Sequence, residues 1–108
     1  MQVRIIVDAS ADLPEESLKD ILVVPLPVHF EAQTILGNSA AQKREFYMQL
    51  ETCSQLPTTS QATPAMFQAL FESIAADGDQ AVVITLSSEL SGTYQSACIA
   101  AADYTGIY

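Results

Sequence analysis

The sequence predicts an α/β fold in which a parallel sheet carries flanking helices. Strand-like and helix-like segments alternate along the 108 residues, which is the pattern of such folds. Continuous β-branched and apolar runs at 3–7 and 81–86 are typical of strands buried on both faces. The length suits about one domain, and 49% apolar with 16% charged residues indicates a globular chain. We therefore expect residues 1–108 to form a single α/β domain.

The first thirty residues are expected to hold two strands joined by a helix. Residues 3–7 form the first strand, and a polar turn over 8–12 follows it. A short helix then begins at Pro14, because proline is tolerated in a first helical turn, and it ends near Asp20. The run 21–30 is a second strand, and its two prolines each remove a donor from the hydrogen-bond ladder. We therefore place that strand at an edge or irregular position.

The middle of the chain is expected to turn at Gly37-Asn38 and then form a helix over 40–52. Ser39 as N-cap and Gln42 three residues later make a capping box, which favours a helix beginning between them. One face of this helix carries apolar residues at helical spacing: Phe46, Leu50 and Cys53. Residues 53–61 are expected to be a loop.

The last part of the chain is expected to alternate helix, strand and helix. Thr63 and Pro64 are typical of an N-cap and a first helical residue, and Gly78 is expected to end that helix. Its core face is a stripe at helical spacing: Met66, Phe67, Leu70, Phe71 and Ile74. Residues 81–86 form a third strand, residues 87–92 a loop, and residues 93–102 an alanine-rich helix.

Charge and cysteine content exclude several functions. Four Lys and Arg against 13 Asp and Glu give a net charge of −9, which disfavours binding to nucleic acid or to an anionic membrane. No run is long and apolar enough to span a bilayer, and no signal peptide is indicated. We expect Cys53 and Cys98 to be free thiols in a reducing cytoplasm, with Cys98 buried among its apolar neighbours.

Three hydroxyl-rich loops predict a small anion site. Loops 8–12 and 87–93 follow the ends of predicted strands, where α/β sheets bind ligands, and loop 57–61 precedes a helix. Ser91-Gly92-Thr93 would offer hydroxyls and free N–H groups at a helix N-terminus. No Lys or Arg lies in these loops, so neutral donors would suit a singly charged carboxylate better than a triphosphate. Each hydroxyl could equally serve only as a cap or turn former.

Other chemistry is less well supported. The loop that starts at Asp8 departs from a calcium-binding loop at its sixth and twelfth positions, Leu13 and Lys19. His29 is the only histidine, which favours a structural role in a strand over metal binding. Ser91, His29 and Asp8 could be written as a hydrolase triad, but no Gly-x-Ser-x-Gly elbow is present. An enzyme acting on a small carboxylate or phosphate through the hydroxyl loops stays as the alternative function.

Five sequence blocks resemble the N-terminal part of bacterial DegV proteins, over essentially the whole chain. The blocks are Val7-Asp8-Ala9-Ser10-Ala11-Asp12-Leu13-Pro14, Val24-Pro25-Leu26, Glu45-Phe46-Tyr47, Leu56-Pro57-Thr58-Thr59-Ser60-Gln61 and Ser87-Ser88-Glu89-Leu90-Ser91-Gly92-Thr93-Tyr94-Gln95-Ser96-Ala97. The resemblance implies a protein without catalytic residues of its own that binds one long-chain fatty acid and needs no cofactor. It further implies presentation of the carboxylate to a separate fatty-acid kinase.

The resemblance also implies which residues bind the carboxylate. The threonine of the Thr-Ser-Gln motif falls on Thr59, and the serine of the Ser-Gly-Thr motif falls on Ser91. Ser60, Gly92 and Thr93 lie beside them in the sequence. The first hydroxyl loop adds two further candidates: Asp8 and Ser10.

The chain departs from the family pattern in composition and in length. Ala9 stands where the first motif usually has Ser, and Asn38 and Ser39 replace an acidic pair. Family members have about two domains, so we expect this chain to lack the second and to stop before a fourth strand that 105–108 approaches. A chain with half the tunnel is expected to bind fatty acid weakly or not at all. Its unfinished sheet edge predicts association with another copy or a partner.

Overall fold

The computed structural model describes residues 1–37 and 39–108, and its larger sheet is parallel with the strand order β2-β1-β6. The strands are β1 (Val3–Asp8), β2 (Ile21–Val24) and β6 (Gln80–Ile84). Val7 in the central strand lies beside Val23 on one side and Ile84 on the other. The predicted α/β class is confirmed, and β2, which covers residues 21–24 of the predicted second strand, takes an edge position.

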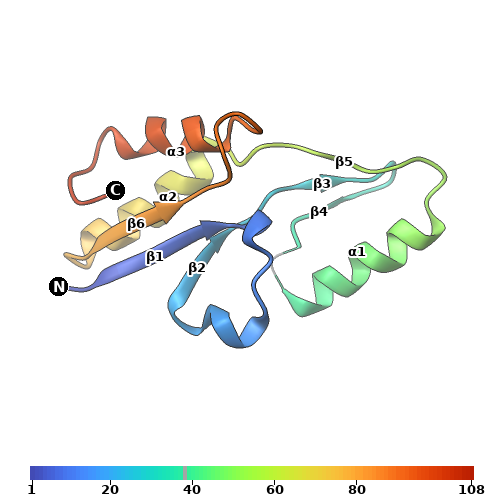
Figure 1. Cartoon of the computed structure of the whole chain (residues 1–108), viewed down its shortest axis with the longest axis horizontal. Coiled ribbons are helices and arrows are strands. Elements are labelled where there is room, and N and C mark those ends of the chain that lie inside the picture. Colours follow the sequence, from blue (N-terminus) through green and yellow to red (C-terminus); the bar gives the residue numbers. More distant parts are fainter. Residues whose placement is uncertain (38) are drawn as a thin grey trace.

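A second, smaller sheet is antiparallel with the order β4-β3-β5 (Figure 1). Its strands are β3 (Val28–His29), β4 (Thr34–Ile35) and β5 (Thr58–Thr59). The prediction of one strand over 21–30 is therefore wrong, because the chain leaves the first sheet after Val24 and joins the second at Val28. Pro25 and Pro27, which have no N–H to donate, lie in the break. The loop predicted over 53–61 likewise contains β5.

The helices begin where the capping residues indicated. They are α1 (Ala40–Thr52), α2 (Pro64–Ala76) and α3 (Thr93–Ala101), with 3₁₀ turns η1 (Ala9–Ala11) and η2 (Glu15–Asp20). Ser39 Oγ accepts from the Gln42 N–H at 3.2 Å, and Thr63 Oγ1 accepts from the Met66 N–H at 3.3 Å. The turn predicted at Gly37-Asn38 falls partly on Asn38, outside the described residues.

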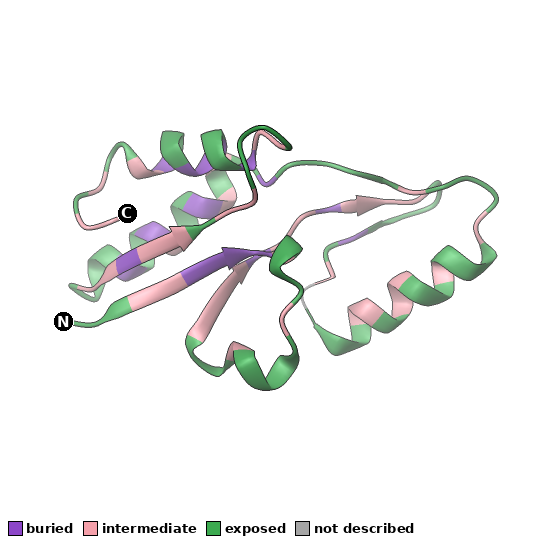
Figure 2. Ribbon diagram, viewed as in Figure 1, coloured by how far each residue is buried: buried purple, intermediate pink, exposed green. Residues whose placement is uncertain are grey.

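The core lies between the parallel sheet and helices α2 and α3 (Figure 2). Phe67, Phe71 and Ile74 on α2 are buried, as their spacing predicted, and they pack with Ile6 of β1 and Val24 of β2. The α3 helix contributes Ala97 and Ala100 to the same cluster. Helix α1 buries no residue completely, although Phe30 and Phe46 lie with ring centroids 6.0 Å apart.

Cys98 is exposed on α3, so its predicted burial is wrong. The residues on either side of a helical position do not share its face, because successive residues are turned by about 100°. Ala97 and Ala100 face the core, whereas Cys98 and Ile99 face outward. Both cysteines are free thiols, as expected.

The last three residues pair with the open edge of β6. Ala81 and Val83 donate to the carbonyls of Gly106 and Tyr108, at 2.9 and 2.7 Å, and Tyr108 donates to Ala81 O at 2.9 Å. Ala81 and Ile107 form a parallel bridge. Residues 106–108 therefore lie as the beginning of a fourth strand would.

Phe71→Ala is expected to lower the free energy of unfolding by about 3–5 kcal/mol, because it removes a fully buried ring and leaves a cavity. Urea denaturation followed by circular dichroism measures the change. Met48→Ala, at a residue that is 62% exposed, is the control and should change the free energy by less than about 0.5 kcal/mol. Equal losses for the two variants would contradict the assigned core.

Candidate ligand-binding site

Asp8 ends β1, and its buried carboxylate joins two loops. The side chain is 1% exposed and accepts hydrogen bonds from the Ser10 N–H at 2.8 Å and from the Ser10 hydroxyl. Its other oxygen accepts from the Leu86 N–H at 2.7 Å, just beyond β6. The carboxylate therefore fixes the hydroxyl loops that follow β1 and β6 relative to each other.

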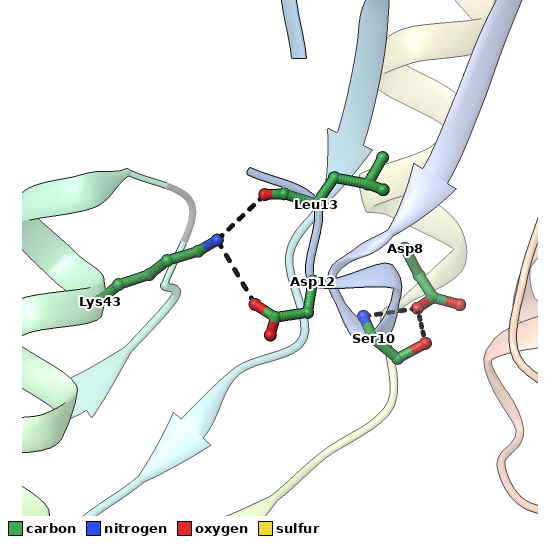
Figure 3. A network of polar contacts seen from close by, with 5 residues as sticks. All are labelled: Asp8, Ser10, Asp12, Leu13 and Lys43. Atoms are coloured by element: carbon green, nitrogen blue, oxygen red, sulfur yellow. Dashed lines mark hydrogen bonds and ion pairs between the residues drawn. The ribbon is translucent and has the colours of Figure 1, made fainter. Parts of the chain in front are cut away.

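Lys43 connects helix α1 to the loop after β1 (Figure 3). Its ammonium lies 3.5 Å from Asp12 Oδ1 and donates to Leu13 O at 3.4 Å. Both side chains are largely solvated, and such pairs contribute about 0–1 kcal/mol. The contact joins α1 to the first hydroxyl loop and brings one ammonium to its far end, at Asp12 and Leu13.

Ser91 and Thr93 form a hydroxyl pair at the start of α3. The two oxygens lie 3.0 Å apart, and Ser91 Oγ also accepts from the Thr93 N–H at 3.2 Å. Thr93 is completely buried, whereas Ser91 is half-buried. Ser91 is therefore the hydroxyl of this pair that a ligand can reach.

The buried hydroxyl of Thr93 joins this loop to the one that precedes α2. Thr93 Oγ1 accepts from the Ala62 N–H at 3.3 Å, and both residues are completely buried. The neighbouring residues also touch, since a Cβ added at Gly92 would lie 2.1 Å from Gln61 Oε1. Gly92 therefore lets the Thr-Ser-Gln and Ser-Gly-Thr motifs approach each other.

Thr59 and Ser60 lie on opposite faces of their segment. In the register of β3 and β5, Thr59 pairs with Val28 and Thr58 with His29. Ser60 continues this pairing, because its N–H donates to Pro27 O at 3.1 Å. Its hydroxyl lies 2.8 Å from His29 Nε2, so Ser60 shares the face of His29, and Thr59 presents its side chain on the other.

His29, Ser91 and Asp8 do not form a catalytic triad. The two imidazole nitrogens of His29 contact Thr34 Oγ1 at 3.0 Å and Ser60 Oγ at 2.8 Å. Asp8 binds the loops after β1 and β6, and Ser91 binds Thr93. The structural role expected for His29 agrees with these contacts.

An apolar hollow of about 170 Å³ lies between β6, α3 and the C-terminal residues. Phe71, Val83 and Ala97 line it, and Tyr94 and Cys98 lie at its side. A hydrogen bond with Cys98 raises the pKa of the Tyr94 hydroxyl above its ordinary value, and the negative charge of the Cys98 thiolate adds to the effect. The volume of this hollow is smaller than that of pockets for drug-sized ligands, which is about 300–1,000 Å³.

The described part of the chain offers neither a metal site nor a spanning helix. Among residues 1–37 and 39–108, no three His, Cys, Asp or Glu side chains are grouped so that they could hold a metal ion. None of the helices in those ranges has the length and apolar character that crossing a bilayer requires.

The structure places some of the predicted residues in two groups, and Thr59 belongs to neither of them. Asp8 and Ser10 meet the loop after β6, and Gly92 and Thr93 meet the segment that follows Ser60. Sequence reasoning missed Ala62 and Leu86, which act through backbone N–H groups that any residue type carries. It also missed the bond between His29 and Ser60, which depends on the strand register.

Residues 2–107 match the DegV family, whose description reads "Uncharacterised protein, DegV family". A DegV domain-containing protein of Caldanaerobacter subterraneus is 38% identical over 101 residues, which are 92% of this chain and 36% of that protein. Protein DegV of Bacillus subtilis is 34% identical over 102 residues, which are 93% of this chain and 36% of that protein.

Solved structures of the family are also similar. A DegV lipid-binding protein from Thermotoga maritima has a TM-score of 0.90 at 31% identity and covers this chain fully, with 40% of its own chain matched. DegV from Bacillus subtilis, a fatty-acid-binding protein, has a TM-score of 0.84 at 31% identity, with 99% of this chain and 39% of that chain matched. A stearic-acid-binding protein from Eubacterium ventriosum has a TM-score of 0.81 at 25% identity, with 97% of this chain and 39% of that chain matched.

This chain therefore spans well under half the length of the relatives that it matches. The match to the family covers nearly every residue, and the fold of the solved members agrees with the fold described above. The chain belongs to the DegV family.

Proposed function

We propose that the chain is the N-terminal part of a longer DegV protein that binds a long-chain fatty acid through its carboxylate. The observation that carries the proposal is the junction of Gln61 and Ala62 with Gly92 and Thr93, which sets two hydroxyl-bearing motifs side by side. Similar proteins that are described as binding lipid, fatty acid or stearic acid support the ligand class.

Thr59 and Ser91 are the proposed donors to the carboxylate. Thr59 lies on the face of β5 opposite the His29 contact, and Ser91 is the more accessible hydroxyl of its pair. Hydrogen bonds from neutral donors to a charged acceptor contribute about 1.5–3 kcal/mol each, so two or three can orient a carboxylate without a cation. Gly92 leaves room for the backbone at the start of α3.

Four further residues position these donors in our proposal: Asp8, Ser10, Ser60 and Thr93. Asp8 and Thr93 are buried, and their polar atoms are engaged with other loops. An ionised carboxylate would also repel the fatty-acid carboxylate, which places Asp8 behind the ligand rather than against it. Ser10 serves the same junction through its bonds to Asp8.

Binding of the acyl tail and contact with the partner require further residues of the intact protein. The apolar hollow of about 170 Å³ is too small for a long acyl chain, so further residues of the intact protein complete the tunnel. The bound carboxylate is presented to a separate kinase that uses ATP and phosphorylates it. Residues 106–108 pair with β6 as the start of a fourth strand would, which supports continuation of the sheet by additional chain or by another copy.

An enzyme acting on a small carboxylate or phosphate gains no support from these contacts. Such an enzyme needs a general base beside a nucleophile or substrate. His29 and Asp8 are each bound to other groups, and neither contacts Ser91. Mass spectrometry of the ligand extracted from the purified protein separates the two functions, since an acyl chain supports binding and a polar metabolite supports the enzyme.

Thr59→Ala combined with Ser91→Ala is expected to weaken palmitate binding by the intact protein at least about tenfold, because each change removes a hydroxyl donor from the carboxylate. Calorimetric titration measures the dissociation constant. Thr58→Ala is the matched control, since Thr58 is the neighbouring threonine and lies on the other face of β5. Unchanged retention of lipid in the double variant would reject the proposed donors.

The 108-residue chain alone is expected to bind palmitate much more weakly than the intact protein. Burial of the tail contributes about 0.8 kcal/mol per CH₂, and most of that burial needs the missing part of the tunnel. Parallel titrations of the two proteins test this. Sub-micromolar affinity of the 108-residue chain would contradict it.

Gly92→Ala is expected to weaken palmitate binding while changing the free energy of unfolding little. The new methyl group would overlap the side-chain amide of Gln61 and push it out of the junction between the two motifs, which disturbs the proposed site. Gln61 is exposed, so its displacement costs little stability. Gly78→Ala is the opposite control: Gly78 has a φ of 74°, so alanine there costs about 1–2 kcal/mol of stability and leaves binding intact. Calorimetric titration of both variants measures palmitate affinity, and urea denaturation measures the free energy of unfolding. A loss of stability without a loss of affinity in Gly92→Ala would contradict the prediction.

A further inference from the structure

The contacts of His29 point to a positioning residue for the carboxylate site, an inference that rests on the proposed function. His29 binds Ser60 from the face of β5 opposite Thr59 and thereby holds the Thr59 hydroxyl in place. The proposed donors do not include this histidine, and we place it behind Ser60 rather than against the ligand. Its effect on binding passes through Ser60.

The first step is the position of the histidine within the small sheet. His29 pairs with Thr34 on β4 and with Thr58 on β5, so the imidazole lies on the central strand. Nδ1 is 3.0 Å from Thr34 Oγ1, and Nε2 is 2.8 Å from Ser60 Oγ. One ring therefore connects β4 to the segment that leaves β5.

The second step is the lack of other side-chain anchors for that segment. Among the described residues, Ser60 is the only member of 55–60 whose side chain makes a hydrogen bond or ion pair. The strands β3 and β5 each have two residues, and so short a ladder is marginal by itself. Both the backbone bond from Ser60 to Pro27 O and the side-chain bond to His29 hold Ser60.

The third step is what this anchor does to the neighbouring threonine. Side chains alternate along an extended segment, so fixing Ser60 on one face fixes Thr59 on the other. A side chain whose backbone is already held binds an anion with less conformational entropy left to lose. His29 thus preorganises Thr59. The Ser60 hydroxyl binds the imidazole rather than the ligand.

The two ring nitrogens bind different partners, so substitutions can remove one bond and keep the other. A neutral imidazole has one donor and one acceptor nitrogen, and hydroxyls can complement either arrangement. Glutamine places its terminal amide near the position of Nε2, whereas asparagine places its amide near Nδ1. His29→Gln therefore keeps the bond to Ser60, and His29→Asn keeps only the bond to Thr34.

The test compares these two variants in the intact protein that carries the chain. We expect His29→Asn to weaken palmitate binding about three- to tenfold in calorimetric titration and His29→Gln to stay within twofold of the parent. In the Ser60→Ala background, His29→Asn should cause no further loss of palmitate affinity, because the hydrogen bond through which His29 acts is already absent. Melting temperatures should be alike for the two His29 variants.

The outcomes separate this inference from the proposed function. Hydrogen exchange at the Ser60 amide, measured without ligand, should speed up in His29→Asn and not in His29→Gln. A parent protein that binds no palmitate but shows this exchange pattern would refute the function and leave the positioning role supported. Equal exchange and binding in both variants, or rescue by Asn rather than Gln, would overturn the role of His29.

Discussion

The buried hydroxyl of Thr93 is the contact on which the arrangement of the site depends. It accepts the N–H of Ala62, which lies 31 residues earlier, and it also meets Ser91 at the start of α3. Without this bond the buried N–H of Ala62 would lose its partner, which costs about 1–3 kcal/mol. The contact holds Ala62, which lies three residues after Thr59, at the start of α3, so it joins the segment that leaves the small antiparallel sheet to the loop that carries Ser91. Asp8 plays the corresponding part between β1 and the loop after β6.

The sequence predicted most of the features that are determined locally. The capping residues at Ser39 and Thr63 placed the first residues of α1 and α2, because the hydrogen bonds that start a helix lie within four residues. The stripe on α2 likewise placed Phe67 and Phe71 in the core. The class of the larger sheet followed from its continuous apolar strands. The candidate motifs were visible because each lies in a single short stretch.

Features that depend on pairing between distant segments could not be predicted from the sequence in the same way. The apolar run 21–30 looks continuous, and its prolines indicated irregularity without showing that the chain would change sheets. The bond between His29 and Ser60 requires the register of two strands that only the folded chain defines. Cys98 was misplaced because the helix turns its neighbours inward and the thiol outward. Asp8 has the residue type of a ligand contact, yet the fold surrounds its carboxylate with donors from two loops.

The central strand of the larger sheet has a consequence for how the chain is made. β1 is translated before β6, and Val7 pairs with Ile84, which lies more than 70 residues later in the sequence. At roughly 5–20 residues per second, the nascent chain waits about 4–15 s between the emergence of β1 and that of β6. During that time one side of β1 has no ladder partner, while α1 and α2 can already form from local contacts. Such long-range closure slows folding and leaves an unpaired strand available to the wrong neighbour. A nascent chain therefore carries an unpaired β1 edge until β6 has emerged and closed it.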